Sequence, residues 1–146
     1  MDKTWELLLG VFALISTTVS AAPFVDTNWK VIGYVGEAWF ANPSKIIGKH
    51  QYFFKGEAAG VFYACDFGGQ SKTYTKYTPE EFLANKEFVL FNEDSIELGD
   101  GPIYVHRISC NGLEEATRKV LYPFVTQDNS NNAYYLFEGA IYILEH

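Results

Sequence analysis

The sequence predicts a mainly β protein, with an α+β arrangement as the alternative. We expect a single antiparallel β-sheet system or a small β-barrel of about nine short strands, with two or three short helices and one disulfide. Three observations predict this class. Aromatic residues make up 17% of the chain, and they favour pleated, half-buried surfaces. Turn signals recur at short intervals, and the two cysteines, Cys65 and Cys110, each close an apolar, strand-like stretch.

The first residues have the pattern of a secretory signal peptide. Leu7–Ile15 is an apolar run that is too short to span a membrane. The small residues of Ser16–Ala22 follow it, as they do at a peptidase cleavage site. Cleavage after Ala21 would separate a signal at residues 1–21 from a single β-rich domain at residues 22–146. The alternative is a buried N-terminal helix. We therefore expect a secreted or periplasmic protein with no stable membrane span after the signal is removed.

The first half of the mature chain predicts strands around one short helical turn. Trp29–Val35 is apolar on both faces, which indicates a central strand. Asn42–Gly48 begins with an Asn cap followed by proline and ends in glycine, a pattern typical of one or two helical turns. Gln51–Phe54 and Val61–Cys65 predict the two strands of a loose hairpin.

An edge strand, a capped helix and another strand are expected next. Ser71–Tyr77 alternates lysine and tyrosine with threonine, and lysine is typical of sheet edges. Thr78 is followed by Pro79 and, three residues after the threonine, by Glu81, which predicts a helix that starts with a capping box. This explains Glu81 better as a cap than as a catalytic carboxylate. Glu87–Phe91 predicts the next strand.

Two further hairpins are predicted in the second half of the chain. Ser95–Leu98 and Ile103–Ser109 flank a turn rich in glycine. Ala133–Phe137 and Ala140–Leu144 flank a two-residue Glu-Gly loop, a strong hairpin signal because glycine accepts positive φ.

A short helix and an irregular strand are expected between these hairpins. Oppositely charged side chains four positions apart predict an exposed helix near residues 112–119. Leu121–Val125 is apolar but contains Pro123. Proline cannot donate to a sheet, so this segment is predicted to be an edge or irregular strand.

The two cysteines are expected to form a disulfide. Cysteines of exported proteins usually pair, and Cys65 and Cys110 lie 45 positions apart. Closing a loop of that size stabilises a protein by about 4 kcal/mol in the chain-entropy model. The alternative is two buried free thiols. Their spacing matches neither a zinc site nor a thioredoxin-type motif.

Several function classes are disfavoured. The net charge is −7 and the lysines and arginines are scattered, which argues against nucleic-acid binding. His50, His106 and His146 lack the spacing of metal ligands. Nucleophile-elbow, dinucleotide-binding and phosphate-loop motifs are missing. We therefore expect no cofactor and no metal, and an enzyme is disfavoured without being excluded.

Five residues are candidates for a binding site. His106 could act as a general base in a pocket, but such a base needs an oriented partner, so a half-buried sheet histidine is the simpler interpretation. The aromatic candidates could equally belong to the core or to ordinary surface. The candidate binding residues are Trp39, Phe40, Tyr74, Tyr77 and His106.

The function expected by elimination is that of a small exported, non-enzymatic binding protein. It would engage another protein in an inhibitor- or immunity-type role, and its acidic charge suits a basic partner. The alternative is a small β-barrel that carries an apolar ligand, a lipocalin-like role. An enzyme and a structural or envelope role remain further alternatives. The sequence predicts no oligomeric state.

Overall fold

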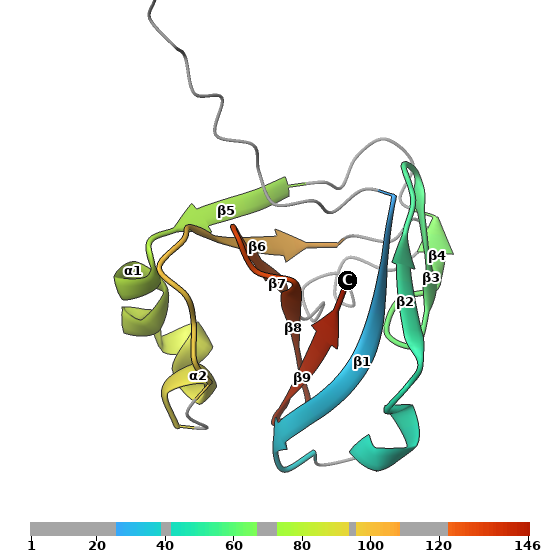
Figure 1. The fold of residues 1–146 in the computed structure, drawn as a ribbon, viewed down its shortest axis with the longest axis horizontal. Helices are drawn as coiled ribbons and strands as arrows, with labels where there is room; N and C mark the ends of the chain where they lie inside the picture. Colours follow the sequence, from blue (N-terminus) through green and yellow to red (C-terminus); the bar gives the residue numbers. More distant parts are fainter. Residues whose placement is uncertain (1–25, 39–41, 67–72, 94–95, 109–122) are drawn as a thin grey trace, which may run out of the picture.

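Nine strands form one antiparallel sheet that curls into a half-barrel (Figure 1). The computed structural model describes residues 26–38, 42–66, 73–93, 96–108 and 123–146. The strands are β1 (Thr27–Gly36), β2 (His50–Phe53), β3 (Glu57–Gly60), β4 (Cys65–Asp66), β5 (Thr73–Tyr77), β6 (Ile103–Arg107), β7 (Phe124–Gln127), β8 (Asn132–Phe137) and β9 (Ala140–Glu145). Their order in the sheet is β4-β3-β2-β1-β9-β8-β7-β6-β5. The mainly β, antiparallel prediction is confirmed in this form.

The helices are short and two of them begin at the predicted caps. They are η1 (Pro43–Ile46), α1 (Pro79–Ala84), η2 (Lys86–Phe88) and α2 (Val89–Glu93). The Asn42 side chain caps η1. At α1 the backbone N–H of Glu81 donates to Thr78 Oγ1 over 3.1 Å, and the backbone N–H of Thr78 donates to Glu81 Oε2 over 2.9 Å. This reciprocal pair is the capping box that the sequence predicts.

Strand β1 is central, as predicted, and a bulge turns its side chains from one face to the other. Trp29 and Val31 are buried on the inner face of the curl. The register with β9 shifts between Val31 and Gly33, and an extra residue in one strand changes which face the following side chains occupy. Tyr34 therefore faces inward opposite Tyr142, while Val35 packs on the outer side. The bulge is why this strand looks apolar on both faces in the sequence.

The sheet has two apolar cores, one on each face. On the inner face the Trp29 and Phe124 rings lie 5.7 Å apart, and the Phe53 and Phe124 rings 4.9 Å apart. On the outer face of β6–β9, Phe82, Phe88 and Phe91 pack against strand residues. Helices α1 and α2 therefore cover the β5–β9 side of the half-barrel, away from β2–β4 (Figure 1).

The strand predicted at Glu87–Phe91 is wrong, because this segment is helical. It forms η2 and the start of α2. Helical geometry places Phe88 and Phe91 on one side of the chain, where both rings contact Phe82, with ring centroids 4.4 and 4.8 Å apart. An alternating strand would have sent these two aromatic side chains to opposite faces. Burial of the phenylalanines therefore decides the local structure.

Two predicted hairpins differ from the structure. The strand at Ser95–Leu98 is wrong where it is described, since Ile96–Leu98 is irregular. The Val61–Cys65 strand is also wrong: β3 starts earlier, at Glu57, directly after a tight turn, and Val61 to Ala64 is irregular. Buried glutamine side chains bond to the backbone at these places: Gln51 to Tyr63 in the first, and Gln127 to Gly99, directly after Leu98.

The edge assignment of Leu121–Val125 is wrong, and the last hairpin is confirmed. Strand β7 lies inside the sheet between β6 and β8, and it starts only after Pro123, so the proline takes no ladder position.

Glu138 and Gly139 connect β8 to β9 with φ values of 48° and 85°, as a type I′ turn requires. Strand β5 is at the sheet edge, as predicted. The helix predicted at 112–119 lies outside the described residues.

Candidate functional site

Two of the predicted binding residues lie together on the inner face of the sheet. Tyr74 on β5 is directly opposite His106 on β6, and their ring centroids are 6.0 Å apart. Tyr74 also contacts the Tyr104 ring at 5.4 Å and is 51% exposed. Tyr77 is elsewhere: its side chain packs against Phe82 and the outer core. Trp39 and Phe40 lie outside the described residues.

His106 is buried, and its surroundings favour a structural role. Its Nε2 atom lies 2.8 Å from Thr126 Oγ1. Burial lowers the pKa of His106 to about 4, since desolvation disfavours the charged ring. At neutral pH the ring is therefore uncharged, hydrogen-bonded to a hydroxyl and packed against Tyr74. A general base is expected to have a pKa nearer the working pH and access to a substrate.

His106 should make the stability of the protein depend on pH. In the unfolded chain the ring titrates near pH 6.5, so between pH 6.5 and pH 4 only the unfolded state binds this proton. The free energy of unfolding should fall by about 3 kcal/mol as the pH drops through this window, and this contribution should level off below it. Urea unfolding at a series of pH values measures the slope. His106→Gln should remove the part of this slope that His106 causes. If the variant still shows the full loss of about 3 kcal/mol between pH 6.5 and pH 4, His106 is not the group responsible.

A row of stacked aromatic side chains lies on the outer face of β2. We call His50, Tyr52 and Phe54 the aromatic row. The Tyr52 and Phe54 rings are parallel to within 3° with centroids 6.1 Å apart, and the His50 and Tyr52 rings to within 18° at 5.8 Å. His50 Nδ1 lies 2.7 Å from Oδ1 of Asn28 on β1. Phe54 is 40% exposed, so the row presents aromatic surface to solvent.

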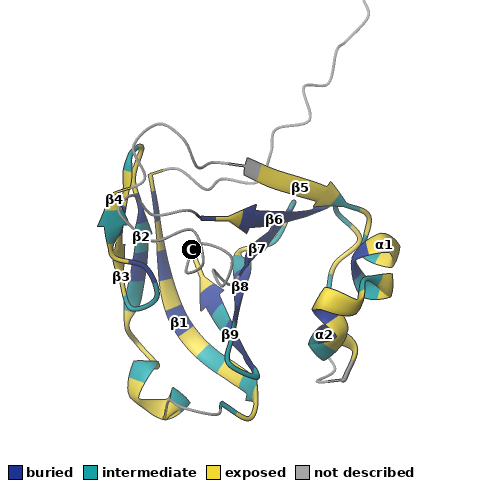
Figure 2. Ribbon diagram, turned by 180° about the vertical axis from the view of Figure 1, so that it is seen from behind, coloured by how far each residue is buried: buried dark blue, intermediate teal, exposed yellow. Residues whose placement is uncertain are grey.

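The strand alternation places this row outside the core. Gln51 and Phe53 are buried on the inner face, so the residues on either side of them point outward. Figure 2 shows the same alternation of buried and exposed positions along β1. Three aromatic residues in succession, Tyr52 to Phe54, could have signalled this site, because a strand can bury only every second one.

No helix among the described residues covers the outer face of β1–β4. Helices α1 and α2 pack over β6–β9 instead, and η1 packs on the inner core through Ile46. Ala59 on β3, with its small side chain, is directly opposite Tyr52. Within the described part of the chain, helices thus cover the outer face of β6–β9 and none covers that of β2–β4, which carries the aromatic row.

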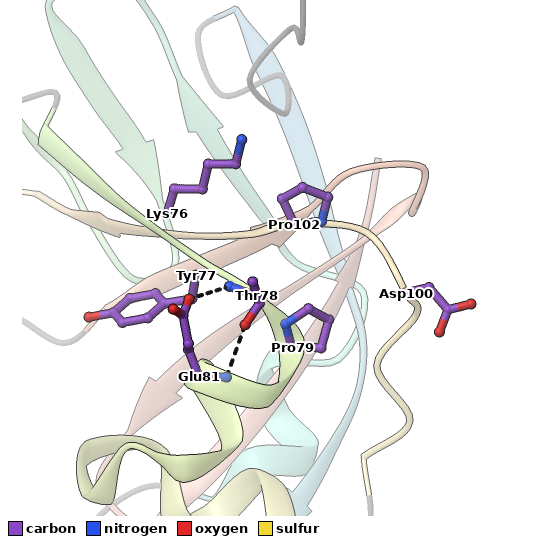
Figure 3. A pocket seen from close by; sticks show the side chains of 7 residues that line it. All are labelled: Lys76, Tyr77, Thr78, Pro79, Glu81, Asp100 and Pro102. Atoms are coloured by element: carbon purple, nitrogen blue, oxygen red, sulfur yellow. Dashed lines mark hydrogen bonds between the residues drawn. The ribbon is translucent and has the colours of Figure 1, made fainter.

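A small cavity of about 280 Å³ lies where β5 meets α1 (Figure 3). Its lining surface is mainly apolar and includes two proline rings, and the Glu81 carboxylate at its wall is engaged in the capping box. Among the described residues, no group of three or more acidic, histidine or cysteine side chains is placed to hold a metal ion. The lining residues are Lys76, Tyr77, Thr78, Pro79, Glu81, Asp100 and Pro102.

Comparison with known proteins gives no relative: no family model, no curated protein and no solved structure matches this chain. A search of the described helices for one long and apolar enough to cross a lipid bilayer found none.

Proposed function

We propose that this protein is a small exported, non-enzymatic binding module that engages another protein in an inhibitor- or immunity-type role. The aromatic row on the bare outer face of β2 is the proposed contact surface. The observation that carries the proposal is the parallel stacking of three partly exposed rings on a sheet face that no described helix covers. Exposed apolar patches often mark interaction sites, and tyrosine and phenylalanine are enriched in protein interfaces.

The row is already ordered, which supports tight binding. The Asn28 contact orients His50, and each ring stacks on the next. A side chain that is fixed before association loses less conformational entropy when a partner binds. Tyr52 also combines a large apolar ring with a hydroxyl, as residues that dominate interface energy often do.

The packing of the inner face supports a protein partner over an apolar ligand. In a lipid-carrying barrel the interior would hold the ligand. In the described part of this half-barrel the interior is occupied by side chains, including Trp29, Phe53, Phe124 and Tyr142, all of which are buried.

Export and a Cys65–Cys110 disulfide belong to the same proposal. The half-buried Cys65 packs against the inner core. That core also contains Ile108, which precedes Cys110 by two residues. No described cysteine is a free thiol. The bond would join β4 to the chain that leaves β6, and these strands lie near opposite ends of the sheet. The proposed location is the periplasm or the outside of the cell, after cleavage behind Ala21.

Partner capture with matched variants tests the proposed surface. The purified mature protein is incubated with the secreted or periplasmic fraction of its source, and complexes are identified by native mass spectrometry. The double variant Tyr52→Ser/Phe54→Ser should weaken a stoichiometric complex by tenfold or more, since central aromatic residues contribute about 2 kcal/mol or more. Tyr74→Ser removes an exposed ring from another face and should leave the complex intact.

Two outcomes would count against this proposal. A complex that survives Tyr52→Ser/Phe54→Ser but is lost with Tyr74→Ser would place binding on the inner face. Retention of a small apolar molecule in place of a protein would favour the carrier function.

A further inference from the structure

We propose that two copies of this chain associate through their β5 strands, which pair antiparallel about a two-fold axis at Thr75 and join the two sheets into one. The pairing is independent of the proposed function, because β5 is at one end of the sheet and β2, which carries the aromatic row, lies near the other end. Three features of β5 support it: a free backbone edge, exposed side chains, and a sequence that is complementary to itself when reversed.

The outer edge of β5 is a row of backbone groups that no described strand uses. Strand β5 is the last strand in the sheet order and lies at the rim of the half-barrel (Figure 1). All five of its residues pair with β6, from Thr73 opposite Arg107 to Tyr77 opposite Ile103. In an antiparallel ladder alternate residues direct their N–H and C=O groups to the same neighbour. The other residues of β5 therefore direct theirs to the free edge, where they fit one further extended strand.

This edge is accessible to another molecule. Tyr74, Thr75 and Lys76 are all exposed, and Tyr74 is 51% exposed. Helix α1, which follows β5, turns toward the sheet: its Phe82 ring contacts Tyr77 and belongs to the core on the outer face of β6–β9. In Figure 1, α1 accordingly lies on the β6 side of β5. An incoming strand would thus meet β5 without displacing a described helix.

The side chains of β5 favour a second β5 as that strand. A two-fold axis at Thr75 pairs all five residues of one copy with all five of the other. In this register Tyr74 of each copy lies opposite Lys76 of the other, and Thr75 lies opposite Thr75. A lysine ammonium is attracted to the face of a tyrosine ring, and threonine pairs stabilise neighbouring strands. The same favourable tyrosine–lysine pair therefore forms twice in one dimer, as two-fold symmetry requires.

Lysine commonly protects a sheet edge from indiscriminate pairing, and here Lys76 also selects the register. An axis at Lys76 would bring the two lysines directly opposite each other, and like charges in that position are destabilising. An axis at Tyr74 would leave Lys76 and Tyr77 opposite residues outside β5. The axis at Thr75 avoids both costs, because it places a tyrosine opposite each lysine and uses the whole strand.

Sedimentation equilibrium of the mature protein tests the pairing. The concentration series is run at physiological salt, where exposed charges more than about 8 Å apart are largely screened. The average mass should rise from that of a monomer toward that of a dimer as the concentration increases. One pair of short strands is a small interface, so we expect a dissociation constant on the order of 0.1 mM.

Two substitutions of the same exposed residue form the matched comparison. Tyr74→Lys would place a lysine opposite Lys76 and should weaken the dimer about tenfold, whereas Tyr74→Glu would place a carboxylate there and should keep the affinity within about threefold. Adding Lys76→Glu to Tyr74→Lys should restore the dimer, because each introduced lysine then meets a carboxylate. Urea unfolding of each variant checks that the fold is kept.

The total charge of the chain predicts the opposite order. The net charge is −7, so Tyr74→Lys reduces the overall repulsion between two copies and Tyr74→Glu increases it. A dimer that follows this order, or that both variants weaken equally, would overturn the proposed register. A protein that remains monomeric up to about 1 mM would overturn the pairing itself. A dimer lost with Tyr52→Ser/Phe54→Ser but kept with Tyr74→Lys would do the same, because it would place the second copy on the aromatic row.

Discussion

Replacing Gln51 with leucine is expected to lower the free energy of unfolding by about 4 kcal/mol. Gln51 is fully buried on the inner face of β2. Its side chain makes hydrogen bonds to the irregular segment that follows β3, of the kind that a neighbouring strand would make. Its Oε1 accepts hydrogen bonds from the backbone N–H groups of Phe62 and Tyr63, each over 2.9 Å. Its Nε2 donates to the carbonyls of Ala59 and Tyr63 over 3.2 and 3.1 Å.

The size of this effect follows from the groups that leucine would leave behind. Leucine fills a similar volume but offers no polar atom, so two backbone N–H groups and the three carbonyls of Tyr52, Ala59 and Tyr63 lose a partner. Each buried group without a partner costs about 1–3 kcal/mol, and local relaxation recovers part of this. Neighbouring Gly60, with φ of 147°, passes so close that an added Cβ would lie 2.4 Å from the His50 carbonyl oxygen. The segment therefore has little room to rearrange.

Urea unfolding of Gln51→Leu beside Gln127→Leu measures this prediction. Gln127 is also buried and also bonds to a loop backbone, through Gly99 and Gly101. It makes fewer such bonds, so its replacement should destabilise the protein less. A loss below about 1 kcal/mol for Gln51→Leu would show that water or relaxation replaces the lost bonds.

Removing the proposed Cys65–Cys110 disulfide should destabilise the oxidised protein by about 4 kcal/mol. Both the order of the strands in the sheet and the length of the loop that the bond closes contribute to this stabilisation. Strand β4 is at one end of the sheet and β6 is next to the other end, and the described strands form no ladder that joins β4 to β5 or β6. A covalent bond between these ends would limit how far the half-barrel opens when it unfolds.

Chemical denaturation of Cys65→Ala/Cys110→Ala provides the measurement. Reductant should lower the stability of the wild-type protein to that of the double variant, while the double variant should be insensitive to reductant. Thiol titration of the unfolded, unreduced protein should detect no thiol. Two titratable thiols would refute the bond and would weaken the case for export.

The parts of the fold that depend on neighbouring residues are readable in the sequence. The Thr78 capping box and the Glu138-Gly139 turn were predictable because each is completed within a few residues. Lysine in β5 correctly indicated a sheet edge. The segment of Phe88 and Phe91 was not predictable in this way, because its apolar spacing suits a short strand or a helix and only contact with Phe82 distinguishes them.

The candidate site was only partly accessible from the sequence. Tyr74 and His106 were named as candidates, and pairing of β5 with β6 brings their rings together. The aromatic row was missed because Tyr52 and Phe54 look like core residues until one knows which side of β2 is covered. The strand's alternation puts them on one face, but the choice of that face as the outer one depends on Gln51 and Phe53 packing inward.

The sequence by itself determined the mainly β class, the β8–β9 hairpin and the capped helix, because these follow from local propensity, turn geometry and nearby hydrogen bonds. Tertiary structure decided the rest. Pairing of β1 with β9 joins segments far apart in the chain, the curl creates an inner face, and α1 and α2 cover only one outer half. Which aromatic residues remain exposed depends on contacts between distant segments, so the bare face with the aromatic row emerges only when the whole sheet is assembled.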